Sequence, residues 1–457
     1  MNITPGSFSN RVFKRQGKQG CDACEIMAAS INAVDPYQSV KAHIQELDQL
    51  FSEKDFSRTF LIGFGKASVP MAKAIIDSYG DKLVSANVIT KDEKFKIDDG
   101  YKGKLQVYFG GHPVLTIDSI RSTQAILSSL PVLNKNDLVL ITISGGGSAL
   151  FTEPIQGITI ADLQKLTEEL LKSGADINEI NTIRKHLDKV KGGRLALRLQ
   201  PAQILTYILS DVIGNHVDMI ASGPAIPDST TYSDAAEIIE KYGLYDKLPE
   251  TILNSIDEGV RGIISETMKP KDFPDARIQN VFVGSNIDAL IAAHQQAVSL
   301  GYRSLIVSDH LTGSTESAAK FIDDTIQSII LDNQPMKDSF CLLFGGETTV
   351  KVTGCGTGGR NQDLTLRMVS RMSRYPGALF ASLATDGDDG PTDAAGAVTD
   401  SIINGEGKAI GLDIDNYIKV NNSYNYFDRL GGLIKIGATG TNVNDLMIVL
   451  IKGPAED

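Results

Sequence analysis

The chain has 457 residues, a formal net charge of −12 and 42% hydrophobic residues, a composition typical of a globular protein. The acidic balance argues against nucleic-acid binding. No run approaches about twenty uninterrupted apolar residues, so no membrane span is predicted. The N-terminal residues lack the apolar core of a signal peptide. We therefore expect a cytoplasmic protein of two or three domains.

Short apolar strands alternate with helices along most of the chain, which favours parallel sheets with helices on both faces. The predicted elements, in chain order, are a strand over 58–62, a helix over 67–79, strands over 137–143, 203–209 and 280–283, a helix over 287–299, a strand over 303–307, a helix over 317–331, and strands over 348–352 and 379–383. A proline-containing stretch with weak strand signal, 248–278, predicts a boundary between two α/β domains, residues 1–250 and 275–457.

The four cysteines include one close pair. Cys21 and Cys24 form a CxxC, which is typical of a redox pair or half of a zinc site. A zinc site needs a second close pair, and Cys341 and Cys355 are far apart from each other in sequence. We interpret Cys21 and Cys24 as thiols without a function at the start of a helix.

Two glycine-containing loops follow predicted strands in the first half. Gly63 to Ser68, GFGKAS, resembles half of a dinucleotide fingerprint, but Ser68 stands at the third glycine position. Lys66 is either a surface lysine or a cation directed into a cleft. The second loop has a serine on each side of three glycines, which suits a backbone nest for phosphate oxygens. A nucleophilic serine is the alternative, but the GxSxG of a hydrolase elbow is absent. The residues of this second loop are Ser144, Gly145, Gly146, Gly147 and Ser148.

Two further loops carry acidic side chains. Asp211 follows the strand over 203–209, where a carboxylate can hold Mg²⁺ or accept a proton. His216 nearby is interpreted as structural, the commoner role of a lone histidine. The glycine-rich loop 386–393 carries four aspartates without EF-hand spacing, which favours Mg²⁺ with few protein ligands over a calcium cage. An ordinary acidic turn is the alternative for this loop.

The segment 345–362 is the most unusual part of the sequence. Gly358 and Gly359 end a glycine-rich loop and are followed by Arg360 and a helical pattern. Such a loop exposes backbone N–H groups to an anion, and arginine adds a planar fork for phosphate or carboxylate. A flexible glycine hairpin with a solvated arginine is the alternative.

Smaller motifs indicate the same chemistry. Arg184 and Lys191 belong to a basic cluster, and Gly284, Ser285 and Asn286 follow the strand over 280–283. Glycine loops with lysine, arginine and aspartate at several strand ends are what nucleotide-dependent phosphoryl transfer requires.

The motifs, taken in order, resemble those of glycerate 2-kinases of the MOFRL type over nearly the whole chain. The motifs that carry the resemblance are GFGKAS (63–68), GGHPV (110–114), SGGGSAL (144–150), NTIRKHLDKVKGGRLA (181–196), SDVIGNHVDMIASGPAIPD (210–228), GGETTVKVTGCGTGGRNQD (345–363), ATDGDDGPTDAAGA (384–397) and TGTNVNDL (439–446).

The resemblance implies ATP-dependent phosphorylation of D-glycerate at its 2-hydroxyl, with Mg²⁺ or another divalent cation. It implies a Rossmann-like N-terminal domain and a MOFRL-type C-terminal domain, each with a largely parallel sheet flanked by helices, and a cleft between them. The protein is expected to be a monomer or homodimer that binds neither nucleic acid nor membrane.

The family's essential lysine and arginine map to Lys66 and Arg360, and we add Asp211 as a third catalytic residue. The other expected roles are phosphate binding by 144–148, Gly284, Ser285, Asn286, Gly358 and Gly359; substrate binding by Lys66, Arg360, Asn361, Arg184 and Lys191; and metal binding by Asp386 and Asp211.

This sequence departs from the family pattern after SDVxG, where the two acidic residues common in relatives are Asn215 and His216. Asp388 also replaces a residue that is often neutral. The metal-binding role therefore falls on Asp211 or Asp386. An NAD(P)H-dependent hydroxypyruvate reductase and a non-catalytic nucleotide or sugar-acid sensor are the alternative functions.

Overall fold

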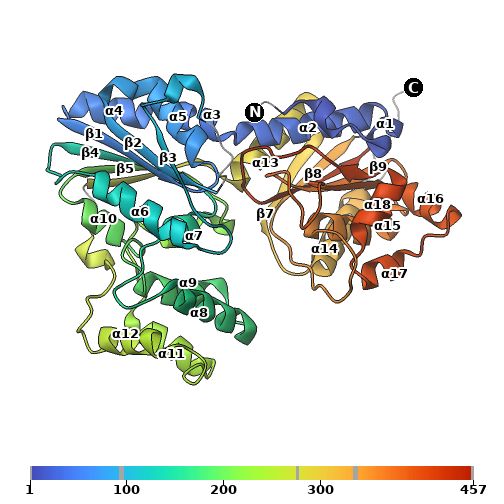
Figure 1. Cartoon of the computed structure of the whole chain (residues 1–457). Helices are drawn as coiled ribbons and strands as arrows, with labels where there is room; N and C mark the ends of the chain where they lie inside the picture. Colours follow the sequence, from blue (N-terminus) through green and yellow to red (C-terminus); the bar gives the residue numbers. More distant parts are fainter. Residues whose placement is uncertain (1–2, 92–96, 274–276, 333–337, 454–457) are drawn as a thin grey trace. The chain divides into compact units, whose positions relative to one another are not determined.

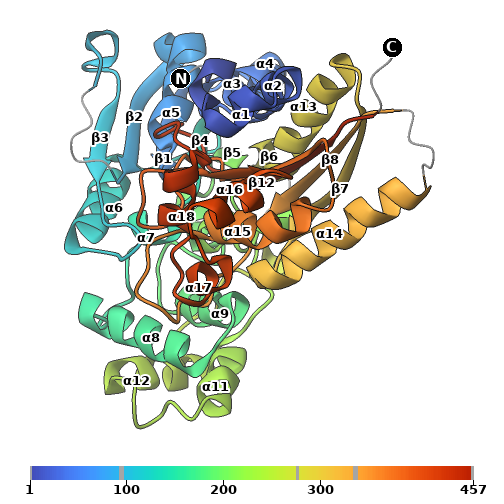
Figure 2. The ribbon, with the colours of Figure 1, turned by 90° about the vertical axis from the view of Figure 1, so that its right-hand side faces the viewer.

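The computed structural model describes residues 3–91, 97–273, 277–332 and 338–453. The chain forms two compact units, one of Pro36–Val283 and one of Met1–Asp35 with Gly284–Asp457. None of the helices in the described ranges is long and apolar enough to cross a membrane. Figures 1 and 2 show the ribbon from two directions.

The unit of residues 36–283 is built on a six-stranded sheet in the order β3-β2-β1-β4-β5-β6. The pairs β1–β2, β1–β4, β2–β3 and β4–β5 are all parallel. This order is that of the Rossmann fold, so the predicted Rossmann-like domain is confirmed. The strands are β1 (Arg58–Phe64), β2 (Leu83–Thr90), β3 (Gln106–Phe109), β4 (Asp137–Ile143), β5 (Gln203–Leu209) and β6 (Ile278–Gly284).

Helices cover both faces of this sheet, as Figure 1 shows. Every residue of β4 is buried, because a central parallel strand has side chains packed on each face. The helices of the sheet layers are α3 (Pro36–Ala42), α4 (Gln45–Glu53), α5 (Ser68–Tyr79), α6 (Ile117–Ser129), α7 (Gly147–Leu150) and α10 (Arg194–Leu199).

Four more helices of the same unit form a lobe below the sheet in Figure 1. The helical lobe has its own apolar core, which includes Leu166, Ile183 and Ile252. Its helices are α8 (Ile160–Ser173), α9 (Ile177–His186), α11 (Tyr232–Lys241) and α12 (Glu250–Val260). The predicted boundary stretch 248–278 therefore contains a packed helix, α12; residues 274–276 of that stretch lie outside the described residues.

The second unit contains a sheet in the order β11-β10-β9-β12-β8-β7. The expectation of a largely parallel sheet is wrong here: only β7–β8 is a parallel pair among the pairs described. The last strand, β12, runs antiparallel to both β8 and β9, and β10 is antiparallel to β9. The strands are β7 (Arg303–Leu311), β8 (Phe340–Gly346), β9 (Ala378–Ala384), β10 (Gly396–Asp400), β11 (Leu433–Ile434) and β12 (Asp445–Ile451).

Helices lie on both faces of the mixed sheet (Figure 2). On one face are α1 (Arg11–Arg15), α2 (Lys18–Ala33) and α13 (Asn286–Ser299), and on the other are α14 (Thr315–Asp332), α15 (Arg360–Met372), α16 (Ile403–Ala409), α17 (Ile414–Lys419) and α18 (Ser423–Leu430). Short 3₁₀ turns occur at Pro5–Phe8, Gly80–Lys82, Asp99–Tyr101, Ile213–Asn215, Ile220–Ser222 and Pro270–Asp272.

Residues 1–35 pack with the C-terminal unit, so the compact units differ from the predicted division at 1–250 and 275–457. Arg15 pairs with Asp400 at 2.6 Å, and Gln19 donates to the carbonyl of Leu450 at 3.1 Å. These partners are 385 and 431 residues away along the chain, separations that local sequence patterns do not reveal. Cys24 of α2 is buried, which raises the pKa of its thiol to about 12 and leaves it protonated.

The strand predicted over 348–352 is not formed. Only Thr349 makes an isolated bridge, with Ser314, and the following residues are irregular. Alternation of threonine and valine is a strand pattern, but it needs a neighbouring edge to pair with.

Candidate functional site

The loops after β1 and β4 lie side by side where the strand order of the first sheet reverses. In such sheets ligands bind beyond the carboxyl ends of the strands at this point. The N–H of Lys66 donates to the carbonyl of Gly145 at 2.9 Å. The N–H of Ala67 donates to Oγ of Ser144, also at 2.9 Å. The two predicted glycine motifs therefore form one structure.

Glycines permit this close contact. Gly65 has φ +121°, and a Cβ there would lie 2.4 Å from the carbonyl oxygen of Ser144. Gly146 has φ +85°, and a Cβ there would lie 2.7 Å from the ring of His112. Both positions combine left-handed backbone with a crowded neighbour, so only glycine fits.

The glycine loop 144–148 opens into a cavity of about 620 Å³. The cavity lies wholly within the unit of residues 36–283, between the loops at the sheet edge and helices α8 and α9 of the helical lobe. Its size is that of a small-molecule site. The predicted site residues that line it are Ser144, Gly146, Gly147, Ser148, Arg184, Lys191 and Asp211.

A chain of hydrogen bonds connects the glycine loop to α9. The hydroxyls of Ser148 and Ser222 are 2.8 Å apart, and Ser222 donates to Oδ1 of Asn181 at 3.1 Å. Ala221 and Ser222 have φ of 50° and 61°, values that cost a non-glycine residue free energy. Strained backbone of this kind is concentrated at functional sites, and here it borders the cavity.

Arg184 and Lys191, the two predicted cations that line the cavity, differ in their partners. Lys191 is buried, donates to the carbonyl of Phe151 at 2.9 Å and pairs with Asp188 at 3.2 Å. Arg184 donates Nη2 to the hydroxyl of Thr167 at 3.1 Å, and no carboxylate of the described residues forms an ion pair with it. Burial lowers the pKa of both side chains. Arg184 remains charged, since guanidinium does not deprotonate in proteins, so it offers uncompensated positive charge to the cavity.

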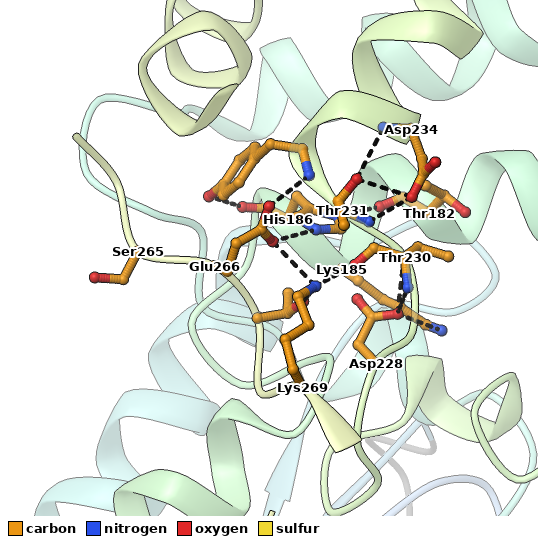
Figure 3. Close-up of polar contacts among 12 residues, drawn as sticks. Thr182, Lys185, His186, Asp228, Thr230, Thr231, Asp234, Ser265, Glu266 and Lys269 are labelled. Atoms are coloured by element: carbon orange, nitrogen blue, oxygen red, sulfur yellow. Dashed lines mark hydrogen bonds and ion pairs between the residues drawn. The ribbon is translucent and has the colours of Figure 1, made fainter. Parts of the chain in front are cut away.

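The C-terminal end of α9 is fixed by a polar network, drawn in Figure 3. Lys185 pairs with Asp228 at 3.4 Å, and His186 Nε2 lies 3.1 Å from Glu266, which also pairs with Lys269. Burial lowers the pKa of His186. These contacts anchor α9 to the segments before α11 and after α12. They hold Asn181 and Arg184 toward the cavity.

His112 is a cavity residue that sequence reasoning did not single out. Its ring lies against Gly146. Burial, with the charges of Lys66 and Lys91, lowers the pKa of His112 to about 4. The imidazole is therefore neutral at physiological pH. The only sequence signal was its place in the GGHPV motif; Asn181 and Asp188 likewise lie in a motif but were not assigned roles.

Asp211 follows β5 and lines the cavity, whereas His216 is exposed. Within the described ranges, no group of three or more His, Cys, Asp or Glu side chains is arranged to hold a metal ion. Mg²⁺ commonly takes one or two protein carboxylates and completes its shell with substrate phosphates and water. A single carboxylate beside a phosphate-type loop fits that donor set.

In the C-terminal unit, Arg360 is the first residue of α15 and is held by two carboxylates. Its Nε and Nη2 donate to Asp445 at 2.6 and 2.9 Å, and its Nη1 lies 2.7 Å from Glu347. Asp445 is fully buried, which raises its pKa to about 6, while the bidentate contact with Arg360 limits that rise. Glu347 is 42% exposed, so Nη1 is the part of the fork that faces solvent.

The glycines before Arg360 allow close packing. A Cβ on Gly356 would lie 2.6 Å from the carbonyl oxygen of Val420, and one on Gly359 would lie 2.3 Å from Asp389. Asp389 accepts the N–H groups of Asn361 and Gln362 at 3.1 and 2.9 Å. The first turn of α15 is thus already capped by a carboxylate of the chain.

The other predicted residues of this unit also have internal partners. Asn361 is buried and accepts from Ser382 at 2.6 Å. Asn286 donates to the carbonyls of Val443 and Asp445, and Ser285 donates to Asp288. Asp386 is half-buried and accepts the N–H of Asp388 at 3.1 Å.

Comparison with known proteins agrees with this architecture. Residues 22–257 match a family model described as a domain of unknown function, DUF4147, and residues 340–445 match the MOFRL family. The chain is 40% identical to a D-glycerate 2-kinase of Thermotoga maritima, with 94% of this chain and 97% of that protein covered. It is 38% identical to a glycerate 2-kinase of Pyrococcus horikoshii, with 93% and 96% covered.

Solved structures give the same result. The crystal structure of a glycerate kinase from Thermotoga maritima superposes with a TM-score of 0.84, at 40% identity and with 94% of this chain and 99% of that chain covered. A second structure, of a Pyrococcus horikoshii protein, has a TM-score of 0.77 at 36% identity, covering 95% of this chain and 98% of that one. The chain belongs to the glycerate 2-kinase family of phosphotransferases composed of DUF4147 and MOFRL regions.

Proposed function

We propose that this chain transfers the γ-phosphoryl group of ATP to the 2-hydroxyl of D-glycerate at the cavity of residues 36–283. The observation that carries the proposal is the position of the glycine loop 144–148. The loop lies where the strand order of the Rossmann-like sheet reverses and opens into a cavity lined by Arg184, which forms no ion pair with a carboxylate of the described residues. Such a loop presents backbone N–H groups and suits phosphate oxygens.

Lys66 and Arg184 supply positive charge in this scheme. The backbone of Lys66 is tied to the glycine loop, and its charge acts on His112 in the cavity wall. Phosphoryl transfer depends mainly on positioning and on charge placed near the developing transition state. We assign Lys66 to the transferring phosphoryl group and Arg184 to the phosphates of the donor. Lys191, already paired with Asp188, fixes the wall, and we assign it to the glycerate carboxylate.

Asp211 is the carboxylate proposed to hold Mg²⁺, and bound Mg²⁺ neutralises phosphate charge. Asp211 is also proposed to orient the attacking hydroxyl of D-glycerate, since it borders the same cavity as the glycine loop. The neutral imidazole of His112 adds a hydrogen-bonding group that carries no competing charge.

Arg360 is proposed as a second cation of the reaction. An incoming anion can replace Glu347 at Nη1 while Asp445 keeps Nε and Nη2 in place. Asn361, Gly358, Gly359, Gly284, Ser285 and Asn286 are proposed to shape and support that region, and Asp386 remains a proposed metal ligand.

The test couples the reaction to enolase without a phosphoglycerate mutase. Only 2-phosphoglycerate then gives a signal, and ADP release is followed in a parallel assay. We expect glycerate-dependent signals in both. ADP release with a silent enolase assay would contradict the regiochemistry, and hydroxypyruvate-dependent oxidation of NADH without ADP release would favour the reductase.

A further inference from the structure

One wall of the cavity is apolar, and the proposed phosphoryl-transfer chemistry makes no use of it. This lobe wall consists of Val114, Leu115, Leu163, Leu171 and Ile177. Val114, Leu171 and Ile177 are 58%, 63% and 59% exposed, although they border a concave surface. Apolar side chains gathered in a concavity with a few polar groups are typical of a small-molecule site.

D-glycerate cannot use this wall. Each of its three carbons carries oxygen, and the molecule is small beside a cavity of about 620 Å³. An apolar wall of this kind suits a larger ligand with an apolar part.

Helix α9 shows where that part lies relative to the phosphates. Ile177, Asn181 and Arg184 stand at positions i, i+4 and i+7, so they share one face of the helix. Asn181 is connected through Ser222 to Ser148 of the glycine loop. From Ile177 to Arg184 the helix rises about 10 Å. Along this face an apolar side chain is therefore followed by an amide and then by a cation.

The α8 side of the wall is held by two hydrogen bonds, one to α9 and one to the loop after β3. Leu163, Thr167 and Leu171 share one face of α8, where Thr167 accepts from Arg184. Gln164 of the same helix donates to the carbonyl of Leu115 at 3.3 Å. This hydrogen bond connects α8 to the loop after β3, so the apolar side chains face one space.

We propose that the lobe wall binds the nucleoside of the phosphoryl donor, with its phosphates extending past Arg184 to the glycine loop. This assignment rests on the proposed function, since a kinase needs a donor with both an apolar and a polyanionic part. The helical lobe then selects the donor, while the Rossmann-like sheet supplies the phosphate site.

The test compares ATP with inorganic tripolyphosphate, which has the phosphates but no nucleoside. Binding of each is measured by calorimetry on the full chain and on the double variant Leu171→Gln, Ile177→Gln. We expect ATP to bind about tenfold more weakly to the double variant, through lost apolar burial. The affinity for tripolyphosphate should stay unchanged. Val260→Gln is the matched control, because Val260 is an exposed apolar residue of α12 that does not line the cavity.

Three results would overturn the assignment: unchanged ATP affinity in the double variant, an equal loss for ATP and tripolyphosphate, or a tenfold rise in KM for glycerate with ATP binding unaltered.

Failure of the proposed function looks different. In that case no glycerate-dependent ADP appears, while the preference for ATP over tripolyphosphate still depends on Leu171 and Ile177. Both side chains are exposed, so the unfolding midpoint of the double variant should match the wild type; the single variants separate the effects if it does not.

Discussion

Two glycine-rich loops of this protein look alike in sequence but differ in the state of their polar groups. The loop 144–148 opens into a cavity lined by Arg184, which donates to the hydroxyl of Thr167 and forms no ion pair with a carboxylate of the described residues. The loop 354–359 packs against residues 420–423 and Asp389, and the arginine that follows it is held by Asp445 and Glu347. The glycines of the loop 354–359 allow close packing, and those of the loop 144–148 form a turn that faces the cavity.

The difference shows what makes a loop a binding site. A buried carboxylate partner already offsets the free-energy cost of removing a cation from water, and an anionic ligand must compete with that partner. A cation with only a hydroxyl partner gains from an incoming anion. We therefore expect substitutions of Arg360 to act strongly on stability and substitutions of Arg184 to act mainly on binding.

The largest expected effect is that of Arg360→Met on stability. Removing one partner of a buried pair leaves Asp445 uncompensated, at a cost of about 3–5 kcal/mol in the free energy of unfolding. Without Arg360, the pKa of Asp445 should rise above the value of about 6 it has now. Protonation then removes the penalty, so the deficit should shrink as the pH falls from 8 to 5. Urea unfolding at several pH values measures this.

The double variant Arg360→Met, Asp445→Asn provides the control for that experiment. It removes both charges and should recover most of the lost stability at pH 8. A deficit that is independent of pH and is not recovered would show that Arg360 stabilises the fold by some other route.

Lys66→Met should lower kcat/KM by about a hundredfold or more, the loss seen when one preorganised charge is removed from a transition state. The free energy of unfolding should change little. Lys73→Met is the matched control, since Lys73 lies on α5 and pairs with Asp98 outside the cavity lining. Turnover of Lys66→Met within a few-fold of the wild type would remove Lys66 from the mechanism.

Arg184→Met should weaken ATP binding by about tenfold or more, since a hydrogen bond to a charged group contributes about 1.5–3 kcal/mol. Because no carboxylate of the described residues loses an ion pair, the unfolding midpoint should stay close to that of the wild type. Arg198→Met is the comparison variant; Arg198 pairs with Glu153 and does not line the cavity. Equal ATP affinity in the two variants would contradict the role of Arg184.

The smallest effect concerns the titration of His112. Its folded pKa of about 4 lies below the unfolded value of about 6.5, so the unfolded chain binds more protons between these values. His112 therefore contributes stability above pH 6.5 that is lost as the pH falls toward 4. An anion on the glycine loop offsets the charge of Lys66 and should raise this pKa. NMR titration with and without tripolyphosphate tests both statements, and an ordinary pKa unaffected by the anion would refute them.

The parts of the fold that were predicted from sequence are those that depend on residues close together in the chain. The strands over 137–143 and 203–209 are mostly apolar runs that are each followed by a serine, and the structure forms them with those bounds. The direction of β12 was not predictable, because a strand buried on both faces has the same apolar pattern whether it runs parallel or antiparallel.

The candidate site shows the same difference between features set by neighbouring residues and features set by distant ones. The loop 144–148 was assigned from its own residues. The partner of Arg360 is Asp445, 85 positions away, and nothing near Arg360 reveals it. The helical lobe was missed because its two helix pairs, 160–173 with 177–186 and 232–241 with 250–260, are separated along the chain by α10 and β5. The two pairs come together only in three dimensions.

The central claim is that the phosphates of the donor lie on the loop 144–148. A crystal structure with D-glycerate and the non-hydrolysable analogue β,γ-methylene ATP tests it most directly. We expect phosphate oxygens within hydrogen-bonding distance of the backbone N–H groups of Gly145, Gly146 and Ser148, and the triphosphate beside Arg184. Phosphates seated on the loop 354–359, with the loop 144–148 contacting none of them, would contradict the account.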